Sequence, residues 1–179
     1  DKDSVTVAEI SSFQLETMVT FKPHVTAILN ITPDHLDRHK TLENYIAIKE
    51  SITKNQDGND FCVLNYNDPV LREFGKTPRC KVIFFSSSEE LESGVFLRGD
   101  TMIIKENGVE TPVCTTKDTS LVGMHNYENI MAAIAMTHAM GVPLDTIRQG
   151  IKEFTAVEHR IEFVTEKNGV KYYLSLIHI

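Results

Sequence analysis

The stretch that decides the fold is Val25-Thr26-Ala27-Ile28-Leu29-Asn30-Ile31, a nearly continuous apolar run rich in β-branched residues. A run without apolar–polar alternation is typical of a strand buried on both faces, as in parallel sheets covered by helices. Val5–Ile10 has a similar β-rich composition and predicts another strand earlier in the chain. Both segments are therefore predicted to be central parallel strands.

Outward from this run, strand-like and helix-like segments alternate, which is typical of an α/β fold. A helix is predicted from Leu42 to about Lys54, with Thr41 as its N-cap, followed by strands at Phe61–Leu64 and Val82–Phe85. The predicted architecture is a mostly parallel central sheet flanked by helices.

The pattern changes between residues 94 and 113, where three short apolar runs are separated by Gly99-Asp100 and Asn107-Gly108. Such dipeptides are typical of hairpin turns, so a small antiparallel meander is predicted. The three runs are Val95–Leu97, Met102–Lys105 and Val109–Val113.

Two helices are predicted next, Asn126–Met140 before Gly141 and Leu144–Phe154 after Pro143. Arg160–Val164 and Val170–Tyr173 flank Lys167-Asn168-Gly169 and predict a hairpin that opens a second domain. We expect a first domain over residues 1–156 and the start of a second over 157–173. Residues 174–179 fit neither domain and are expected to be a non-native tail.

Composition excludes several classes of protein. The 179 residues include 25 acidic and 18 basic side chains, a net charge of −7, which argues against a nucleic-acid binder. No apolar run approaches the roughly 18 residues needed to span a bilayer, so no membrane partner is expected. Cys62, Cys80 and Cys114 are too widely spaced for a disulfide framework or a zinc site and predict buried thiols of a cytoplasmic protein.

Polar side chains follow the first two predicted strands. Glu9 lies at the carboxyl end of one, and Asp34 and His35 follow the other. Ligands bind outside the carboxyl ends of parallel strands, so these side chains are predicted to face one crevice, where a carboxylate and an imidazole suggest a cation. The alternative is a solvated helix start, with Asp34 as the cap and Leu36 in the core.

Lys49 lies on an apolar stripe of the helix predicted after Thr41, together with Tyr45 and Ile52. A lysine there must extend its amine to solvent, pair with an acid, or lose its charge by modification. If it points to the crevice, reaction with carbon dioxide would turn the amine into a carboxylate-like metal ligand.

Gly75-Lys76-Thr77 looks like the end of a phosphate-binding loop, but the glycine required five residues earlier is replaced by Val70. The chain also contains no GxGxxG pattern. A phosphate loop for a nucleotide must therefore lie elsewhere.

Asn126 and Asn129 are predicted in the first turn of a helix, where amide side chains can bind a base or ribose and free N–H groups favour anions. A plain asparagine cap is the alternative. Arg160, at the predicted domain junction, can bind a phosphate through two hydrogen bonds, although most such arginines are surface residues.

Five segments in order resemble the Mur ligase family and together span about residues 4–173. The block at residues 11–15, Ser-Ser-Phe-Gln-Leu, is similar to that of the member that adds D-glutamate to UDP-N-acetylmuramoyl-L-alanine. The matching segments are Glu9–Glu16, Ile28–Arg38, Tyr45–Lys49, Gly123–Asn129 and Glu158–Glu162.

The resemblance implies the central ATPase domain of the family and the first hairpin of a Rossmann-like C-terminal domain. It implies ATP-driven amide bond formation in bacterial peptidoglycan precursor synthesis, by an enzyme expected to be a cytoplasmic monomer. The substrate carboxylate attacks the γ-phosphate of ATP to give an acyl phosphate, and the amine of D-glutamate then displaces phosphate. Such chemistry depends on positioning and on cations.

By the same resemblance, Glu9 and His35 are magnesium ligands, and Lys49, carbamylated, completes that site. His35 and Lys49 are thereby catalytic, and Asp34 is an orienting partner. Because imidazole is an unusual ligand for Mg²⁺, Mn²⁺ is expected to substitute for it.

Further roles are implied for residues on other segments. Ser11 and Gln14 are similar to residues that contact the UDP-sugar substrate. Asn126 and Asn129 match contacts to the adenine nucleotide, and Arg160 matches an arginine that reaches the ATP phosphates.

Two departures from the family matter. Its N-terminal UDP-binding domain and phosphate loop are expected before residue 1, and its Asn-Asp-Ser-Lys-like segment is replaced by Leu174–Ile179. The isolated chain is therefore expected to form no amide bond. The alternatives are a ligase of the same family that uses another amino acid or extends folate with glutamate, a non-catalytic metal or nucleotide binder, and a metal-dependent hydrolase using Asp34–His39.

Overall fold

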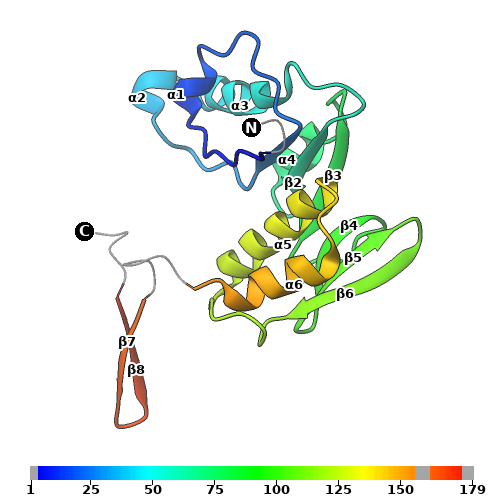
Figure 1. Cartoon of the computed structure of the whole chain (residues 1–179). Coiled ribbons are helices and arrows are strands. Elements are labelled where there is room, and N and C mark those ends of the chain that lie inside the picture. The colour runs from blue at the N-terminus through cyan, green and yellow to red at the C-terminus, as the bar shows by residue number, and fades with distance from the viewer. Residues whose placement is uncertain (1–3, 156–161, 175–179) are drawn as a thin grey trace.

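Strand β2 (Phe61–Asn65) lies within a six-stranded sheet whose order is β1-β2-β3-β4-β5-β6 (Figure 1). The computed structural model describes residues 4–155 and 162–174. Strands β1 to β4 are parallel, and β5 and β6 continue the same sheet in antiparallel fashion. This confirms the predicted α/β fold with its meander. The other strands are β1 (Val25–Ile28), β3 (Lys81–Ser86), β4 (Gly94–Arg98), β5 (Thr101–Glu106) and β6 (Val109–Thr115).

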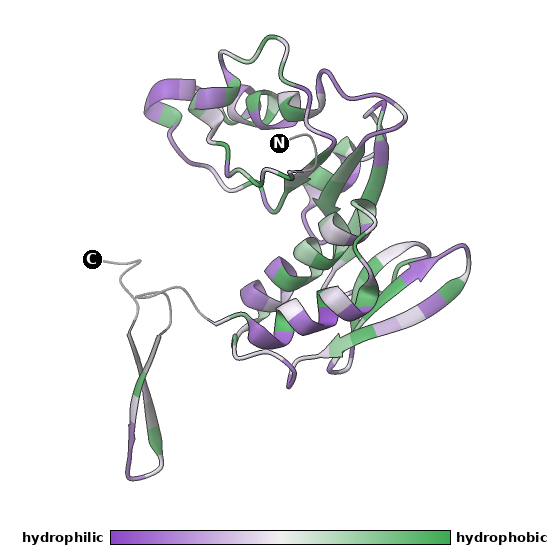
Figure 2. Cartoon of the chain, in the orientation of Figure 1, coloured by the Kyte–Doolittle hydropathy of each residue, from purple (hydrophilic) through white to green (hydrophobic). Residues whose placement is uncertain are grey.

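The two faces of β2 enter two different cores, because successive side chains of a strand point to opposite faces. Val63 packs in a cluster with residues of α5 (Met124–Ala139) and α6 (Leu144–Glu153). Cys62 and Leu64 pack on the other face with Leu71 of α4 (Pro69–Phe74). The sheet is thus the middle of three layers, and Figure 2 shows its central strands as hydrophobic segments.

Three short helical segments gather beside this sheet (Figure 1). They are α1 (Ser12–Leu15), α2 (Leu36–His39) and α3 (Leu42–Glu50), which a 3₁₀ turn (Ser51–Thr53) extends. The hydroxyl of Thr41 accepts a hydrogen bond from the Asn44 N–H, which confirms the predicted cap.

The predicted strand at Val5–Ile10 is wrong, since residues 4–11 form no regular element. Val5 and Val7 are 67% and 85% exposed. A β-rich segment becomes a strand only when its backbone pairs with a neighbour, and β1 pairs only with β2 among the described residues. Glu9 therefore does not lie at the end of a strand.

Other boundaries differ by small amounts. Helix α5 begins at Met124, two residues before the predicted start, and the run at residues 25–31 forms a strand only to Ile28. Helix α4 was not predicted, although Asp68 before Pro69 is a recognisable start, and its carboxylate caps the N–H groups of Val70 and Leu71.

The predicted C-terminal hairpin is confirmed as β7 (Glu162–Lys167) and β8 (Val170–Leu174). Its turn residues, Asn168 and Gly169, both have positive φ values, as a tight hairpin turn requires. Residues 156–161, which include Arg160, and residues 175–179 of the predicted tail lie outside the described residues. The domain boundary near residue 156 stays a prediction.

The three cysteines are buried, as predicted. Burial raises the pKa of the Cys114 thiol to about 11. Within residues 4–155 and 162–174, no helix is long and apolar enough to cross a membrane.

Candidate functional site

The carboxyl ends of β2 and β3 meet in a cluster of polar side chains. Asn67 follows β2, and its amide oxygen accepts hydrogen bonds from the hydroxyls of Ser86 (2.6 Å) and Ser88 (3.0 Å) at the end of β3. The amide nitrogen of Asn67 donates to Ser87 Oγ at 2.6 Å. This is the edge at which parallel sheets bind ligands.

The first turns of α5 reach the same edge. Ser87 Oγ donates to Glu128 Oε1 at 2.6 Å, and Asn67 Nδ2 lies 3.2 Å from the same oxygen. Asn126 is half-buried and donates its side-chain N–H to the carbonyl oxygen of Val122 at 2.8 Å. Asn129 is exposed. The two asparagines therefore lie at the start of a helix, and this N-terminal end is held at the carboxyl edge of the sheet.

Ser11 and Gln14 are partners in one capping box at α1. The Gln14 N–H donates to Ser11 Oγ, while the Ser11 N–H donates to Gln14 Oε1 at 2.8 Å. The structure thus brings these two predicted substrate residues together on an exposed helix start.

His35 adopts a left-handed backbone conformation (φ 51°, ψ 34°) at the start of α2. Its N–H donates to Asp34 Oδ1 at 2.8 Å, and its ring lies 4.9 Å from that of Phe13. Leu36 is 40% exposed, so the alternative with Asp34 as a helix cap and Leu36 in the core is wrong. Non-glycine residues in this conformation are uncommon and occur preferentially at functional positions.

His39 links the three short helices. Its ring is fully buried, with Nε2 3.1 Å from Ser12 Oγ of α1 and the ring centre 5.5 Å from that of Tyr45 on α3. Nδ1 lies 3.3 Å from Glu16 Oε1 but makes no hydrogen bond of good geometry within the described residues. Hydrogen bonds from Arg38 lower the pKa of Glu16, so this carboxylate stays charged.

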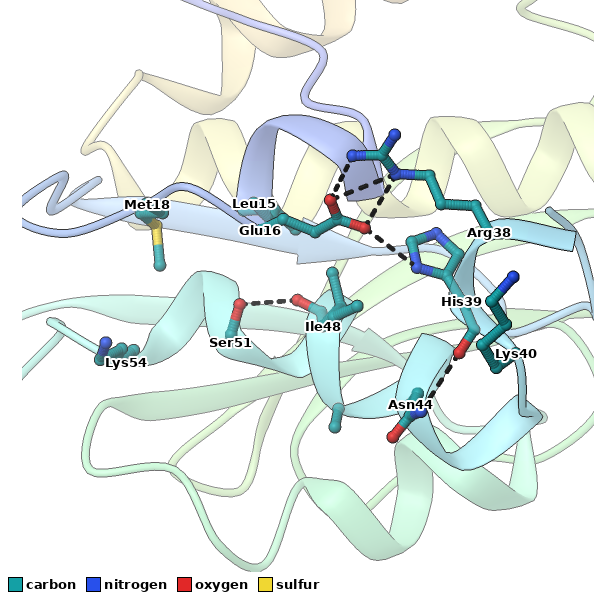
Figure 3. A pocket seen from close by; sticks show the side chains of 11 residues that line it. Leu15, Glu16, Met18, Arg38, His39, Lys40, Asn44, Ile48, Ser51 and Lys54 are labelled. Carbon is teal, nitrogen blue, oxygen red and sulfur yellow. Dashed lines mark hydrogen bonds and ion pairs between the residues drawn. The ribbon is translucent and has the colours of Figure 1, made fainter. Parts of the chain in front are cut away.

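A hollow of about 530 Å³ lies between the end of α1 and α3, with α2 closing one side (Figure 3). Figure 3 shows Glu16 between Arg38 and His39 above the α3 residues. None of the predicted site residues in the described part of the chain lines it. Its lining consists of Leu15, Glu16, Met18, Arg38, His39, Lys40, Asn44, Ala47, Ile48, Ser51 and Lys54.

Lys49 lies on the predicted apolar stripe, with Tyr45 buried and Ile52 packed in a core cluster. Its amine lies 5.1 Å from the centre of the Tyr45 ring, a cation–π contact, and Lys49 makes no ion pair within the described residues. Ring contacts thus run from His35 through Phe13 and His39 to Tyr45, and on to Lys49.

The predicted cation ligands are Glu9, His35 and Lys49. Glu9 is exposed, and in the described part of the chain no three His, Cys, Asp or Glu side chains are placed to hold a metal ion. An unmodified ammonium group cannot ligate a cation. The residues as they stand therefore do not form a complete metal site, and carbamylation of Lys49 would have to supply the missing oxygen ligands.

Two features were missed from the sequence. Asn67, Ser87 and Glu128 lie on three separate segments, and the one signal that could have found this edge of the sheet is the run Ser86-Ser87-Ser88 after a predicted strand. His39 entered the sequence analysis only as a member of the Asp34–His39 cluster of a possible metal-dependent hydrolase, and its buried position between three helices was not predicted.

A mostly parallel sheet with helices on both faces, polar groups at its carboxyl edge and a helix start held there defines an open α/β domain with its candidate site at that edge. Residues 1–137 match the family described as the Mur ligase middle domain. The chain therefore belongs to the Mur ligase family.

Its relatives include ligases of known name. The chain is 53% identical over 173 residues to a UDP-N-acetylmuramoylalanine--D-glutamate ligase of Lachnoclostridium phytofermentans, covering 97% of the chain and 38% of the relative. It is 46% identical over 172 residues to the ligase of the same name from Thermoanaerobacter sp., covering 96% of the chain and 38% of the relative. The chain thus spans less than two-fifths of these relatives.

Solved structures agree in fold. The UDP-N-acetylmuramate-alanine ligase MurC from Thermotoga maritima superposes with a TM-score of 0.66 at 20% identity, over 94% of this chain and 37% of that one. MurF from Acinetobacter baumannii gives 0.64 at 22% identity, over 84% and 33%. At these identities the likeness establishes the fold alone.

Proposed function

We propose that the chain is the ATP-binding middle segment of a ligase that joins D-glutamate to UDP-N-acetylmuramoyl-L-alanine in bacterial peptidoglycan precursor synthesis. One observation carries the proposal, namely the 53% identity to a ligase of that name along 97% of the chain. Because its substrates include ATP, we expect the enzyme to act in the cytoplasm. We also expect it to be a monomer.

The proposed reaction has two steps. The alanyl carboxylate attacks the γ-phosphorus of ATP, which forms an acyl phosphate and releases ADP. The amine of D-glutamate then attacks the acyl carbon, forms the amide, and releases phosphate and a proton. Because both reactants of the first step are anions, positioning and charge neutralisation account for most of the rate.

The proposed residue roles are carried over from the resemblance of their segments to the family. Ser11 and Gln14 at the exposed start of α1 contact the UDP-sugar substrate. Asn126 and Asn129 bind the adenine nucleotide at the start of α5, and Arg160 binds its phosphates.

Glu9, His35 and carbamylated Lys49 would hold Mg²⁺, or Mn²⁺ in its place, and the ion would neutralise phosphate charge. Two observations support this set. His35 has an exposed ring, and Lys49 has no carboxylate partner among the described residues, so its amine is available to carbon dioxide.

A chimera tests the function as a whole, with this chain replacing the matching segment of the Lachnoclostridium phytofermentans ligase. Phosphate release that requires D-glutamate, and is absent with L-alanine or L-lysine, is expected. Turnover of another amino acid would favour a different ligase of the family. Release without any amine would indicate a hydrolase, and ATP binding without turnover would indicate a non-catalytic binder.

A further inference from the structure

Helix α5 begins without a side-chain cap. Its N-cap residue is Gly123 (φ 105°), whose missing side chain leaves the first-turn N–H groups without the hydrogen bond that a Ser, Thr, Asp or Asn would provide. Such an end frays readily. Asn126 and Asn129 lie within its first two turns, so a ligand bound by both needs this end held in one place.

Glu128 is the side chain that ties this end to the sheet. It is half-buried, and its Oε1 accepts hydrogen bonds from Ser87 and Asn67, which follow β3 and β2. A carboxylate near a helix start also interacts favourably with the positive end of the helix dipole. These hydrogen bonds therefore anchor the helix start to the sheet from its second turn, although they do not satisfy the N–H groups that a cap would bind.

The partners of Glu128 are themselves held. Ser86 is fully buried, and its hydroxyl donates to the amide oxygen of Asn67 at 2.6 Å, which directs the amide nitrogen towards Ser87 and Glu128. The Glu89 N–H donates in turn to Ser86 Oγ at 2.9 Å. Ser87 and Asn67, which donate hydrogen bonds to Glu128, thus belong to a rigid part of the sheet edge.

Helix geometry relates Glu128 to the two asparagines. Residues 126 and 129 are separated by about 60° around the helix axis, whereas residue 128 lies about 160° from residue 126. When Glu128 faces the sheet edge, Asn126 faces away from it and Asn129 lies to the same outer side. Together with the buried core residues Ile130 and Met131, Glu128 therefore fixes the rotation of the helix start and with it the side from which both asparagines project.

We propose that Glu128 is a positioning residue for nucleotide binding, which holds the start of α5 against Ser87 and Asn67 so that Asn126 and Asn129 are presented to the adenine nucleotide. This inference rests on the proposed nucleotide site at those asparagines. It adds a residue that does not touch the nucleotide and acts through the helix.

The test is an ATP titration of the whole chain, monitored through the NMR resonances of the backbone amides and asparagine side-chain amides of residues 126–130, with variants of Glu128 and Ser87 and a control variant. Glu128→Ala should weaken ATP binding about tenfold, and Glu128→Gln, which keeps an acceptor oxygen for Ser87, should stay within about threefold of the parent. Ser87→Ala, which removes the donor, should weaken binding to an intermediate degree. Glu153→Ala removes an exposed acidic side chain in the last turn of α6. It is the matched control and should leave the affinity for ATP unchanged.

A purely structural role would lower the unfolding midpoint and leave the affinity of the folded protein unchanged. Parent-like ATP binding by folded Glu128→Ala, or by folded Ser87→Ala if the former does not fold, would overturn the positioning role while leaving the nucleotide site intact. Unchanged binding by Asn126→Ala/Asn129→Ala, or no binding by the parent chain, would instead overturn the proposed nucleotide site and this inference with it.

Discussion

Asp60, before β2, is nearly buried and is held by three neighbouring groups. Its carboxylate accepts the Asp57 N–H at 2.9 Å and lies 3.0 Å from His24 Nδ1 and 3.1 Å from Lys22 Nζ. The backbone hydrogen bond from Asp57 is the largest cause that lowers the pKa of Asp60 to about 2, against the opposing effect of burial. The ionised form is therefore favoured by folding.

A lowered folded-state pKa gives stability that is present above the unfolded pKa, near 3.9, and is lost as pH falls towards 2. Asp60→Asn should lower the free energy of unfolding at pH 7 by about 1–3 kcal/mol and flatten its decline between pH 4 and 2. Urea unfolding at several pH values measures both. Asp145→Asn, at a side chain that is 94% exposed, should keep the parent pH dependence, and an equally steep decline in Asp60→Asn would contradict the assignment.

Gly94, at the start of β4, has a backbone conformation that L side chains rarely adopt (φ 128°), and an added Cβ would lie 2.2 Å from the Phe84 carbonyl oxygen. Gly94→Ala should destabilise the fold by about 3 kcal/mol or more, because backbone must move. Gly99→Ala, also at positive φ but in open space, should lose only about 1–2 kcal/mol. Equal midpoints of urea unfolding for the two variants would contradict this argument.

At the scale of elements, α1 and α2 are four residues each and cannot be stable alone, since isolated helices need about 12–15 residues. Their positions depend on contacts such as that of Ser12 with the buried His39 ring. Ser12→Ala should lower the free energy of unfolding by about 1–3 kcal/mol, because Nε2 loses its partner.

The same variant should speed amide hydrogen exchange in both short helices while leaving β2 and β3 protected. Ser93→Ala, at an exposed serine of the loop before β4, is the control and should leave exchange unchanged. Parent-like exchange rates in Ser12→Ala would show that the hydrogen bond does not hold these helices together.

At the scale of the molecule, the three core clusters draw their members from residues 25 to 151, and they include none of the described side chains of β7 and β8. Truncation after residue 155 should therefore leave the cooperative thermal unfolding of the six-stranded sheet within about 2–4 °C of the parent, since less than 1 kcal/mol is at stake. Calorimetry measures this. A large drop in midpoint would show that the C-terminal hairpin supports the first domain.

Much of the fold was predictable because it depends on local patterns. The apolar run at residues 25–31 indicated a buried parallel strand, and Asn107-Gly108 and Asn168-Gly169 indicated hairpins, since few residues tolerate the positive φ values of such turns. The capping pair Ser11 and Gln14 was found only as a pair of expected substrate contacts, although its spacing is that of a capping box.

What the sequence by itself determined was the class of the sheet, the hairpin turns and the boundaries of α3, α5 and α6 to within a few residues, because hydrophobic periodicity and turn chemistry act over short stretches of chain. Only the tertiary structure decided that Val5–Ile10 is not a strand, since pairing requires a partner elsewhere in the chain. It alone also brought Asn67, Ser87 and Glu128 to one sheet edge and His39 between three helices. Contacts between residues 20 to 60 positions apart depend on how the layers pack, and local sequence carries no record of that.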